Sequence, residues 1–169
     1  MTDRIIHKMI DYFGNDVLRI NHALKVYGFA STMARREKLS DREILVVNIA
    51  SILHDIGIKE AEKKYNSSIG KYQEIEGPAV AVDLLSDINL DKEILDRICF
   101  LIGNHHSYQN IDGIDFQILV EADFLVNIHE DKMNTDLIAK IFEKYFKTKS
   151  GTLMLKSMYL ANYYNNEKI

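Results

Sequence analysis

The sequence is poor in residues that interrupt helices and in residues that cross-link a small domain. It contains one proline, Pro78, eight glycines and a single cysteine, Cys99. One cysteine excludes an internal disulfide, and 169 residues are enough to bury a core without one. Cys99 lies in the apolar stretch RICFLIG, which favours a small buried hydrophobic residue over a nucleophile. These features predict a protein of a reducing compartment, and we expect the cytoplasm.

The sequence also lacks an excess of positive charge and any long apolar run. The formal net charge is −4, which argues against binding the backbone of a nucleic-acid polymer. No stretch approaches the roughly 18 apolar residues of a membrane span. The opening stretch MTDRIIHKMIDYF mixes charges through its apolar residues, unlike a signal peptide. We therefore expect neither a nucleic-acid polymer nor a membrane among the partners of this chain.

Apolar residues recur at intervals of three and four along most of the chain, whereas the alternation typical of strands is scarce. This pattern predicts an all-α, single-domain bundle of seven to nine helices. The predicted helices cover residues 3–13, 17–37, 41–54, 77–86, 91–104, 114–130, 134–146 and 151–165. Asp16 and the capping box from Ser40 to Glu43 mark two of the starts, and Gly77-Pro78 marks a third. Residues 59–71 are expected to be largely irregular.

Several polar residues stand where the surrounding sequence is apolar. They are His22, His54, Asp55, His105, His106 and Asp123. Taken singly, such a histidine is more often a hydrogen-bonded core residue than a ligand, and such an aspartate often caps a helix. Together they have one common explanation, because a divalent metal ion binds neutral imidazoles and compensates buried carboxylates.

Gly57 follows the His54-Asp55 pair and is expected to end the helix in a left-handed conformation. A helix end at this position would let the two neighbouring side chains converge on one ion. On this interpretation, Gly57→Val should lower turnover far more than it lowers stability.

The order of a histidine, a His-Asp pair and a distant aspartate resembles that of the HD superfamily of metal-dependent phosphohydrolases. Here the pair begins 32 residues after His22, and Asp123 lies 68 residues beyond Asp55. The likeness is carried by "NHALKVYGFA", "LHDIG" and "EADFLVNI", in that order. Among the members of the superfamily, this sequence is most similar to the small stand-alone bacterial HD hydrolases.

The resemblance also implies a domain organisation. We expect a single HD domain over residues 1–169, with a motif-bearing core at about 16–130. The C-terminal helices, over 134–165, are expected to pack on that core. Whether the protein is a monomer or a homodimer stays open, because its tyrosine-rich C-terminal stretch could pack on the core or on a partner subunit.

The resemblance implies a metal site made of His22, His54, Asp55 and Asp123. The ion is divalent, and Fe, Mn, Co, Ni, Zn and Mg all remain candidates. Asp55 is also expected to face a water or a second ion.

Members that hold two metals add histidines, one of them before a glycine that opens a helix. The others lie near the end of the following helix, where this chain has His105 and His106. At the first place the stretch KYQEIEGPAV offers Gln73, Glu74 and Glu76 instead. The cofactor is therefore one ion or two, and the candidates for a second metal or phosphate site are His105, His106, Glu74 and Glu76.

The chemistry expected of such a site is hydrolysis of a phosphate ester, of a nucleotide or another small phosphorylated metabolite. A bound metal ion neutralises phosphoryl oxygens and lowers the pKa of a bound water towards about 7. Asp55 would orient or deprotonate that water, and Lys59 would assist catalysis by binding phosphoryl oxygens. Lys71, Ser67 and Ser68 are candidate substrate-binding residues.

The sequence differs from two groups of the superfamily in ways that argue against their activities, and two other functions remain as alternatives to phosphate-ester hydrolysis. Cyclic-dinucleotide phosphodiesterases of the superfamily have a lysine directly after HDIG and a GYP signature after the paired histidines, whereas this chain has Ile58 and HHSYQNIDGID. The acidic cluster that follows HD in alarmone hydrolases is also missing. The main alternative is a non-catalytic HD module that binds a metal or a nucleotide and regulates. Metal-dependent oxygenase chemistry is a third reading, against which the missing histidine before Gly77 argues.

Overall fold

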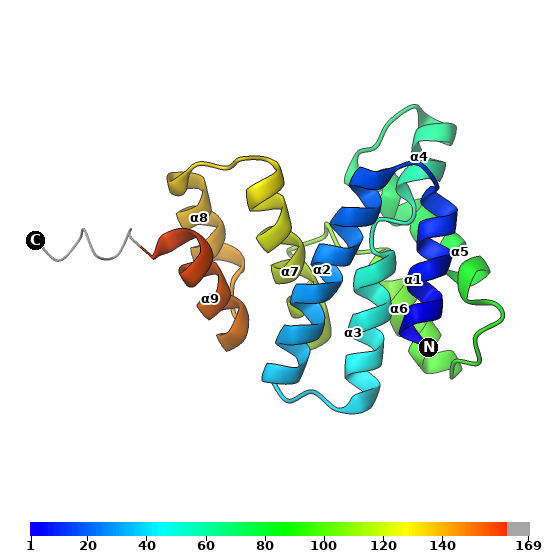
Figure 1. The fold of residues 1–169 in the computed structure, drawn as a ribbon, viewed down its shortest axis with the longest axis horizontal. Helices are drawn as coiled ribbons and strands as arrows, with labels where there is room; N and C mark the ends of the chain where they lie inside the picture. Colours follow the sequence, from blue (N-terminus) through cyan, green and yellow to red (C-terminus); the bar gives the residue numbers. More distant parts are fainter. Residues whose placement is uncertain (162–169) are drawn as a thin grey trace, which may run out of the picture.

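The computed structural model describes residues 1–161, which form an all-α bundle without a strand (Figure 1). Its helices are α1 (Thr2–Phe13), α2 (Val17–Arg36), α3 (Asp41–Leu53), α4 (Ile58–Tyr65), α5 (Gly70–Leu85), α6 (Lys92–Ile102), α7 (Ile114–Glu130), α8 (Thr135–Tyr145), α9 (Lys149–Leu155) and the π-helix η1 (Lys156–Leu160). The all-α prediction is confirmed. The end of the helix predicted over 151–165, and the last part of the tyrosine-rich stretch, lie outside the described residues.

The centre of the bundle is formed by α2, α3 and α7. Helix α2 packs against both others, every residue from Val46 to Leu53 of α3 is buried, and 12 of the 17 residues of α7 are buried. Helices α1, α4, α5 and α6 lie on one side of this centre, and α8 and α9 lie on the other, beside α7 (Figure 1). Within residues 1–161, no helix combines the length and apolar character that crossing a membrane requires.

Local sequence signals set several helix starts as predicted. The Asp16 carboxylate accepts a hydrogen bond from the Arg19 backbone N–H, 3.2 Å away, and caps α2. Ser40 and Glu43 form the predicted capping box at the start of α3, with both reciprocal hydrogen bonds present. These side chains satisfy N–H groups that have no partner inside the helix.

The segment between α3 and α6 differs from the prediction. Residues 59–71 are mostly helical, in α4 and the start of α5, and Pro78 is the ninth residue of α5 instead of lying in its first turn. Because proline lacks an N–H, it leaves the Glu74 carbonyl without its usual helical partner. The missed part of α5 packs against the preceding helix α4, for example through a stacked pair of Tyr65 and Tyr72 with ring centroids 4.2 Å apart.

Gly57 does not adopt the predicted left-handed conformation. Its φ of −73° and ψ of −14° lie in the ordinary right-handed helical region. The glycine is required for another reason: a Cβ at this position would lie 2.4 Å from the Gln73 carbonyl oxygen and 2.5 Å from the Gly77 nitrogen. Gly57 therefore lets the turn after α3 lie directly against the backbone of α5.

A buried carboxylate joins α7 to the start of α9. Glu121 is fully buried and accepts hydrogen bonds from the backbone N–H groups of Lys147 and Thr148, at 2.6 and 2.8 Å. The Thr148 hydroxyl and the Gln117 amide also donate to it. Burial raises the pKa of Glu121, against the effect of these hydrogen bonds.

We expect Glu121→Leu to lower the free energy of unfolding by about 2–5 kcal/mol, because each backbone N–H left buried and unpaired costs about 1–3 kcal/mol. Glu121→Gln keeps one acceptor oxygen and should lose less. Urea denaturation followed by circular dichroism measures both values. A leucine variant as stable as the wild type would show that this carboxylate does not stabilise the α7–α9 contact.

Candidate metal centre

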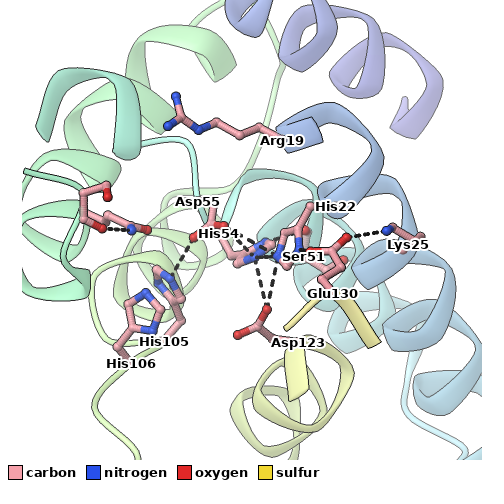
Figure 2. A network of polar contacts seen from close by, with 12 residues as sticks. Arg19, His22, Lys25, Ser51, His54, Asp55, His105, His106, Asp123 and Glu130 are labelled. Carbon is pink, nitrogen blue, oxygen red and sulfur yellow. Dashed lines mark hydrogen bonds and ion pairs between the residues drawn. The ribbon is translucent and has the colours of Figure 1, made fainter. Parts of the chain in front are cut away.

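Four side chains from three parts of the chain meet at the centre of the bundle (Figure 2). His22 comes from α2, Asp123 from the middle of α7, and His54 and Asp55 follow the last residue of α3. His22 Nε2 lies 3.1 Å from His54 Nε2 and 3.2 Å from Asp123 Oδ1. The structure thus brings together the four residues that the sequence predicts as metal ligands.

The spacing of these donor atoms is that of ligands around one ion. Asp55 Oδ2 lies 3.6 Å from His22 Nε2 and 3.5 Å from His54 Nε2, and His54 Nε2 lies 3.7 Å from Asp123 Oδ1. Donors about 2.1 Å from a shared ion are separated by about 3.0 Å in octahedral and about 3.4 Å in tetrahedral coordination. The observed distances fall close to this range.

The hydrogen bonds of the Nδ1 atoms, which point away from the centre, determine the protonation of the Nε2 atoms, which point towards it. His54 Nδ1 lies 2.9 Å from the Ser51 carbonyl oxygen, and His22 Nδ1 lies 2.8 Å from the Glu130 carboxylate. Both partners are acceptors, so each Nδ1 carries a proton and donates it. In a neutral imidazole the Nε2 atom then presents a lone pair. With both rings neutral, two nitrogen lone pairs and two carboxylates converge, an arrangement that a divalent cation fits and stabilises in place of a proton.

Electrostatics favour a cation at this centre. Burial by itself would raise the pKa values of Asp55 and Asp123, but the neighbouring histidines hold both below the usual range. Burial lowers the pKa of His54. Burial also opposes protonation of His22, yet the hydrogen bond and charge of Asp123, with the charge of Asp55, raise its pKa to about 9. Two ionised carboxylates thus lie in a mostly buried place, where the positive charge available within the cluster is a proton on His22.

A second group of possible ligands adjoins the first and shares Asp55. It consists of Asp55, His105 and His106. His105 Nδ1 donates to the Ile102 carbonyl oxygen at 2.8 Å, and His105 Nε2 lies 3.3 Å from Asp55 Oδ1. Asp55 therefore directs one oxygen towards each group.

His106 differs from its neighbour. Its ring packs on that of His105, with centroids 4.0 Å apart, and its Nε2 atom is buried without a hydrogen-bond partner among the described residues. Burial lowers the pKa of His106 to about 4, so the ring is neutral at pH 7. A Cβ on Gly70 would lie only 2.4 Å from this ring, so the absence of a side chain at Gly70 leaves room for the His106 ring.

Glu74 and Glu76 do not join either group. Glu74 accepts hydrogen bonds from the His106 backbone N–H and the Ser107 hydroxyl, at 3.0 and 3.2 Å. Glu76 pairs with Lys64 of α4 and accepts a hydrogen bond from the Tyr65 hydroxyl. Both carboxylates stabilise local structure, which counts against the prediction that they supply metal or phosphate ligands.

The side chains predicted to bind phosphate do not point towards the four-residue cluster either. Lys59 donates a 2.7 Å hydrogen bond to the Tyr12 carbonyl oxygen and lies over the Tyr12 ring, so its amine is held by α1. Lys71 is exposed near the start of α5. The Ser67 hydroxyl accepts a hydrogen bond from the Ile69 backbone N–H, as in a local turn.

Ser68 contributes to the same region through its backbone, because its carbonyl oxygen accepts a hydrogen bond from the Gln73 amide at 2.5 Å. The Ser68 side chain is part of an exposed residue. Gln73 itself is buried, and its amide oxygen has no partner among the described residues. The prediction that Lys59, Lys71, Ser67 and Ser68 act on substrate therefore has no support from their positions.

Two charged residues near His22 were not predicted from the sequence. Arg19 lies one turn before His22 on α2 and forms a two-pronged ion pair with Glu62 of α4, at 2.5 and 3.1 Å. Glu130 binds His22, as described above. Arg19 could have been predicted from the sequence, because it precedes His22 by three positions and residues three apart share a face of a helix. Glu130 lies 108 residues from its partner, and local sequence gave no such signal.

Comparison with known proteins agrees with this geometry. The family model described as HD domain matches residues 19–145, three quarters of the chain. The match includes every residue of both ligand groups. No curated protein and no solved structure matches the chain at a significant level.

Proposed function

The chain belongs to the HD domain family, and we propose that it is a metal-dependent phosphohydrolase that cleaves a phosphate ester of a small, nucleotide-like metabolite. The observation that supports this most is the convergence of four side chains, whose donor atoms lie 3.1–3.7 Å apart in five of the six pairs. In the two histidines of this cluster the outer nitrogen is held by an acceptor, so that the inner one is free to bind a cation.

Four residues would hold the ion: His22, His54, Asp55 and Asp123. When bound, a divalent ion supplies a coordinated water of lowered pKa and positive charge for the phosphoryl oxygens. Imidazole with carboxylate suits Fe, Mn, Co, Ni and Zn, and Mg is kept as a candidate for the oxygen ligands. The adjoining group of Asp55, His105 and His106 would hold a second ion or the substrate phosphate.

Asp55 is the residue best placed to act on a water molecule. Its side chain is 21% exposed, compared with 11% for His22, 7% for Asp123 and 1% for His54, so the cluster is most open to solvent at Asp55. One of its oxygens faces the four-residue cluster and the other faces His105 Nε2. A proton taken from water by Asp55 can therefore pass to His105, whose Nδ1 remains bound to the Ile102 carbonyl.

A cation for the phosphate would come from α2 and not from Lys59. Arg19 lies on the same side of α2 as His22, and its guanidinium can offer two parallel donors to a phosphate. The Glu62 carboxylate now occupies those donors. A bound phosphate would compete with Glu62 for them.

The test is a panel of phosphomonoesters and phosphodiesters, assayed with the protein stripped of metal and then reloaded with each candidate ion. We expect hydrolysis of at least one class, lost on chelation and restored by one or more ions. Metal binding without hydrolysis would favour the alternative of a regulatory module. Failure to bind any ion would contradict the metal site itself.

We expect His105→Ala and His106→Ala to differ. His105 contacts Asp55, so its loss should lower turnover about 10²–10⁴-fold, the range typical of proton-transfer groups. His106 contacts neither Asp55 nor the four-residue cluster through a hydrogen bond, so its loss should mainly raise KM. Steady-state kinetics on both variants checks this. Equal losses in turnover would favour two metal ions, or a phosphate held by both rings.

The wider predictions from the sequence form part of the same proposal. It includes a single HD domain over residues 1–169 with a motif-bearing core at about 16–130, and the family match over residues 19–145 supports it. We also propose that the protein is cytoplasmic and that it is a monomer or a homodimer. Gel filtration with light scattering decides the last point.

A further inference from the structure

One of the two histidines in the four-residue cluster is oriented by a side chain instead of the backbone. The Nδ1 atom of His54 binds a backbone carbonyl, as does that of His105, whereas His22 Nδ1 binds Glu130 at 2.8 Å. The other Glu130 oxygen accepts a hydrogen bond from Lys25, which lies one turn after His22 on α2 (Figure 2). A row of Lys25, Glu130 and His22 thus leads from the surface to the centre.

The stability of the fold does not account for this row. Glu130 is the last residue of α7, where the helix dipole disfavours a carboxylate by about 0.3–1 kcal/mol. The side chains of Glu130 and Lys25 are 32% and 44% exposed, and exposed ion pairs contribute about 0–1 kcal/mol. A glutamine or lysine at the end of α7 would serve the fold as well. The feature that does require a carboxylate at this position is the contact of Glu130 with His22.

We propose that Glu130, held in place by Lys25, is a positioning residue for His22. Its carboxylate keeps the proton on Nδ1, fixes the orientation of the ring and makes Nε2 a stronger metal ligand. Partners of this kind typically contribute about 10- to 100-fold to metal affinity. The inference rests on the proposed function, because it takes His22 to be a metal ligand.

The surroundings of Glu130 make the proposal testable without unfolding the protein. Lys25 and Glu130 line a surface cavity of about 960 Å³ that Tyr159 also lines. Glu130→Gln keeps an amide oxygen that can accept the hydrogen bond from His22 Nδ1, and Lys25→Met leaves a Glu130 carboxylate that is 32% exposed to water. Glu143 on α8 is an exposed glutamate remote in sequence from the cluster, and serves as the matched control.

The experiment uses the full chain, stripped of metal, as wild type, Glu130→Gln, Lys25→Met, the double variant and Glu143→Gln. Competition with a chromophoric chelator gives the affinity for Co²⁺, the absorption of the Co²⁺ form reports its ligand geometry, and melting of the metal-free protein reports the fold. We expect Glu130→Gln to weaken Co²⁺ binding about 10- to 100-fold and to shift the Co²⁺ spectrum, at an almost unchanged melting temperature. Lys25→Met should weaken binding less, and the double variant should resemble Glu130→Gln, because Lys25 acts through Glu130.

Each contrary result has a defined meaning. Wild-type affinity and spectrum in Glu130→Gln would overturn the positioning role. A loss of affinity matched by a large fall in the metal-free melting temperature would assign Glu130 to the fold instead, which also overturns it. Additive effects of the two substitutions would overturn the role of Lys25. A wild-type protein that fails to bind Co²⁺, or any other candidate ion, would remove the proposed metal site on which the inference rests.

Discussion

Replacing either His54 or Asp123 by alanine is expected to abolish metal retention while the helical fold remains. His54 Nε2 and Asp123 Oδ1 are two of the four converging donors, and both residues are buried, His54 directly after α3 and Asp123 within α7. Losing one of four ligands should reduce the bound metal from about one ion per chain to less than a tenth of that, because the remaining donors leave the coordination incomplete. Elemental analysis after dialysis measures this, with circular dichroism as the check on helical content.

The matched control is His129→Ala. His129 lies in the last turn of α7, is exposed, and belongs to neither ligand group. It should retain metal at the wild-type level. If metal content were undiminished in both the His54 and Asp123 variants, the idea of one shared site would fail.

Gly57→Ala is expected to destabilise the protein by about 3 kcal/mol or more, which is at the upper end for overpacking of a close contact. The new Cβ would lie 2.4 Å from the Gln73 carbonyl oxygen and 2.8 Å from the Gly77 Cα atom. These are backbone atoms, so relief requires a shift of α5 and not a change of rotamer. This expectation replaces the one drawn from the sequence, in which substitution of Gly57 affected turnover far more than stability.

Gly28→Ala is the matched control within the same chain. Gly28 lies in the middle of α2, and a Cβ there would meet nothing within 4 Å. Alanine should stabilise the helix by about 0.5–1 kcal/mol, since glycine loses more backbone freedom on folding. Chemical denaturation of both variants gives the comparison. A Gly57 variant as stable as the wild type would show that α5 can yield at this contact.

The central helices and the four converging residues could be predicted because their signals are local. Helix α7 spans residues 114–130, as its apolar stretch predicts, and the capping box places the start of α3. His54, Asp55 and Asp123 attract notice because polar groups in apolar helices are costly unless they are paired. Polar residues of this kind can be recognised from the sequence alone, before any contact is known.

The parts that were missed depend on contacts between distant residues. Pro78 resembles a residue of a first helical turn, but α5 starts at Gly70 because packing against α4 and α6 supports the earlier turns. Glu76 resembles a ligand until its partners on α4 are known. Glu130 resembles an ordinary surface charge, since only the packing of α2 against α7 brings it to His22.

We propose that His22, His54, Asp55 and Asp123 surround one metal ion. Crystals of the protein loaded with Co²⁺ or Zn²⁺, measured on both sides of the absorption edge, locate that ion directly by its anomalous scattering. We expect a peak about 2.0–2.2 Å from His22 Nε2, His54 Nε2 and one oxygen of each aspartate. A loaded protein whose anomalous peaks all lie away from these four atoms would contradict it.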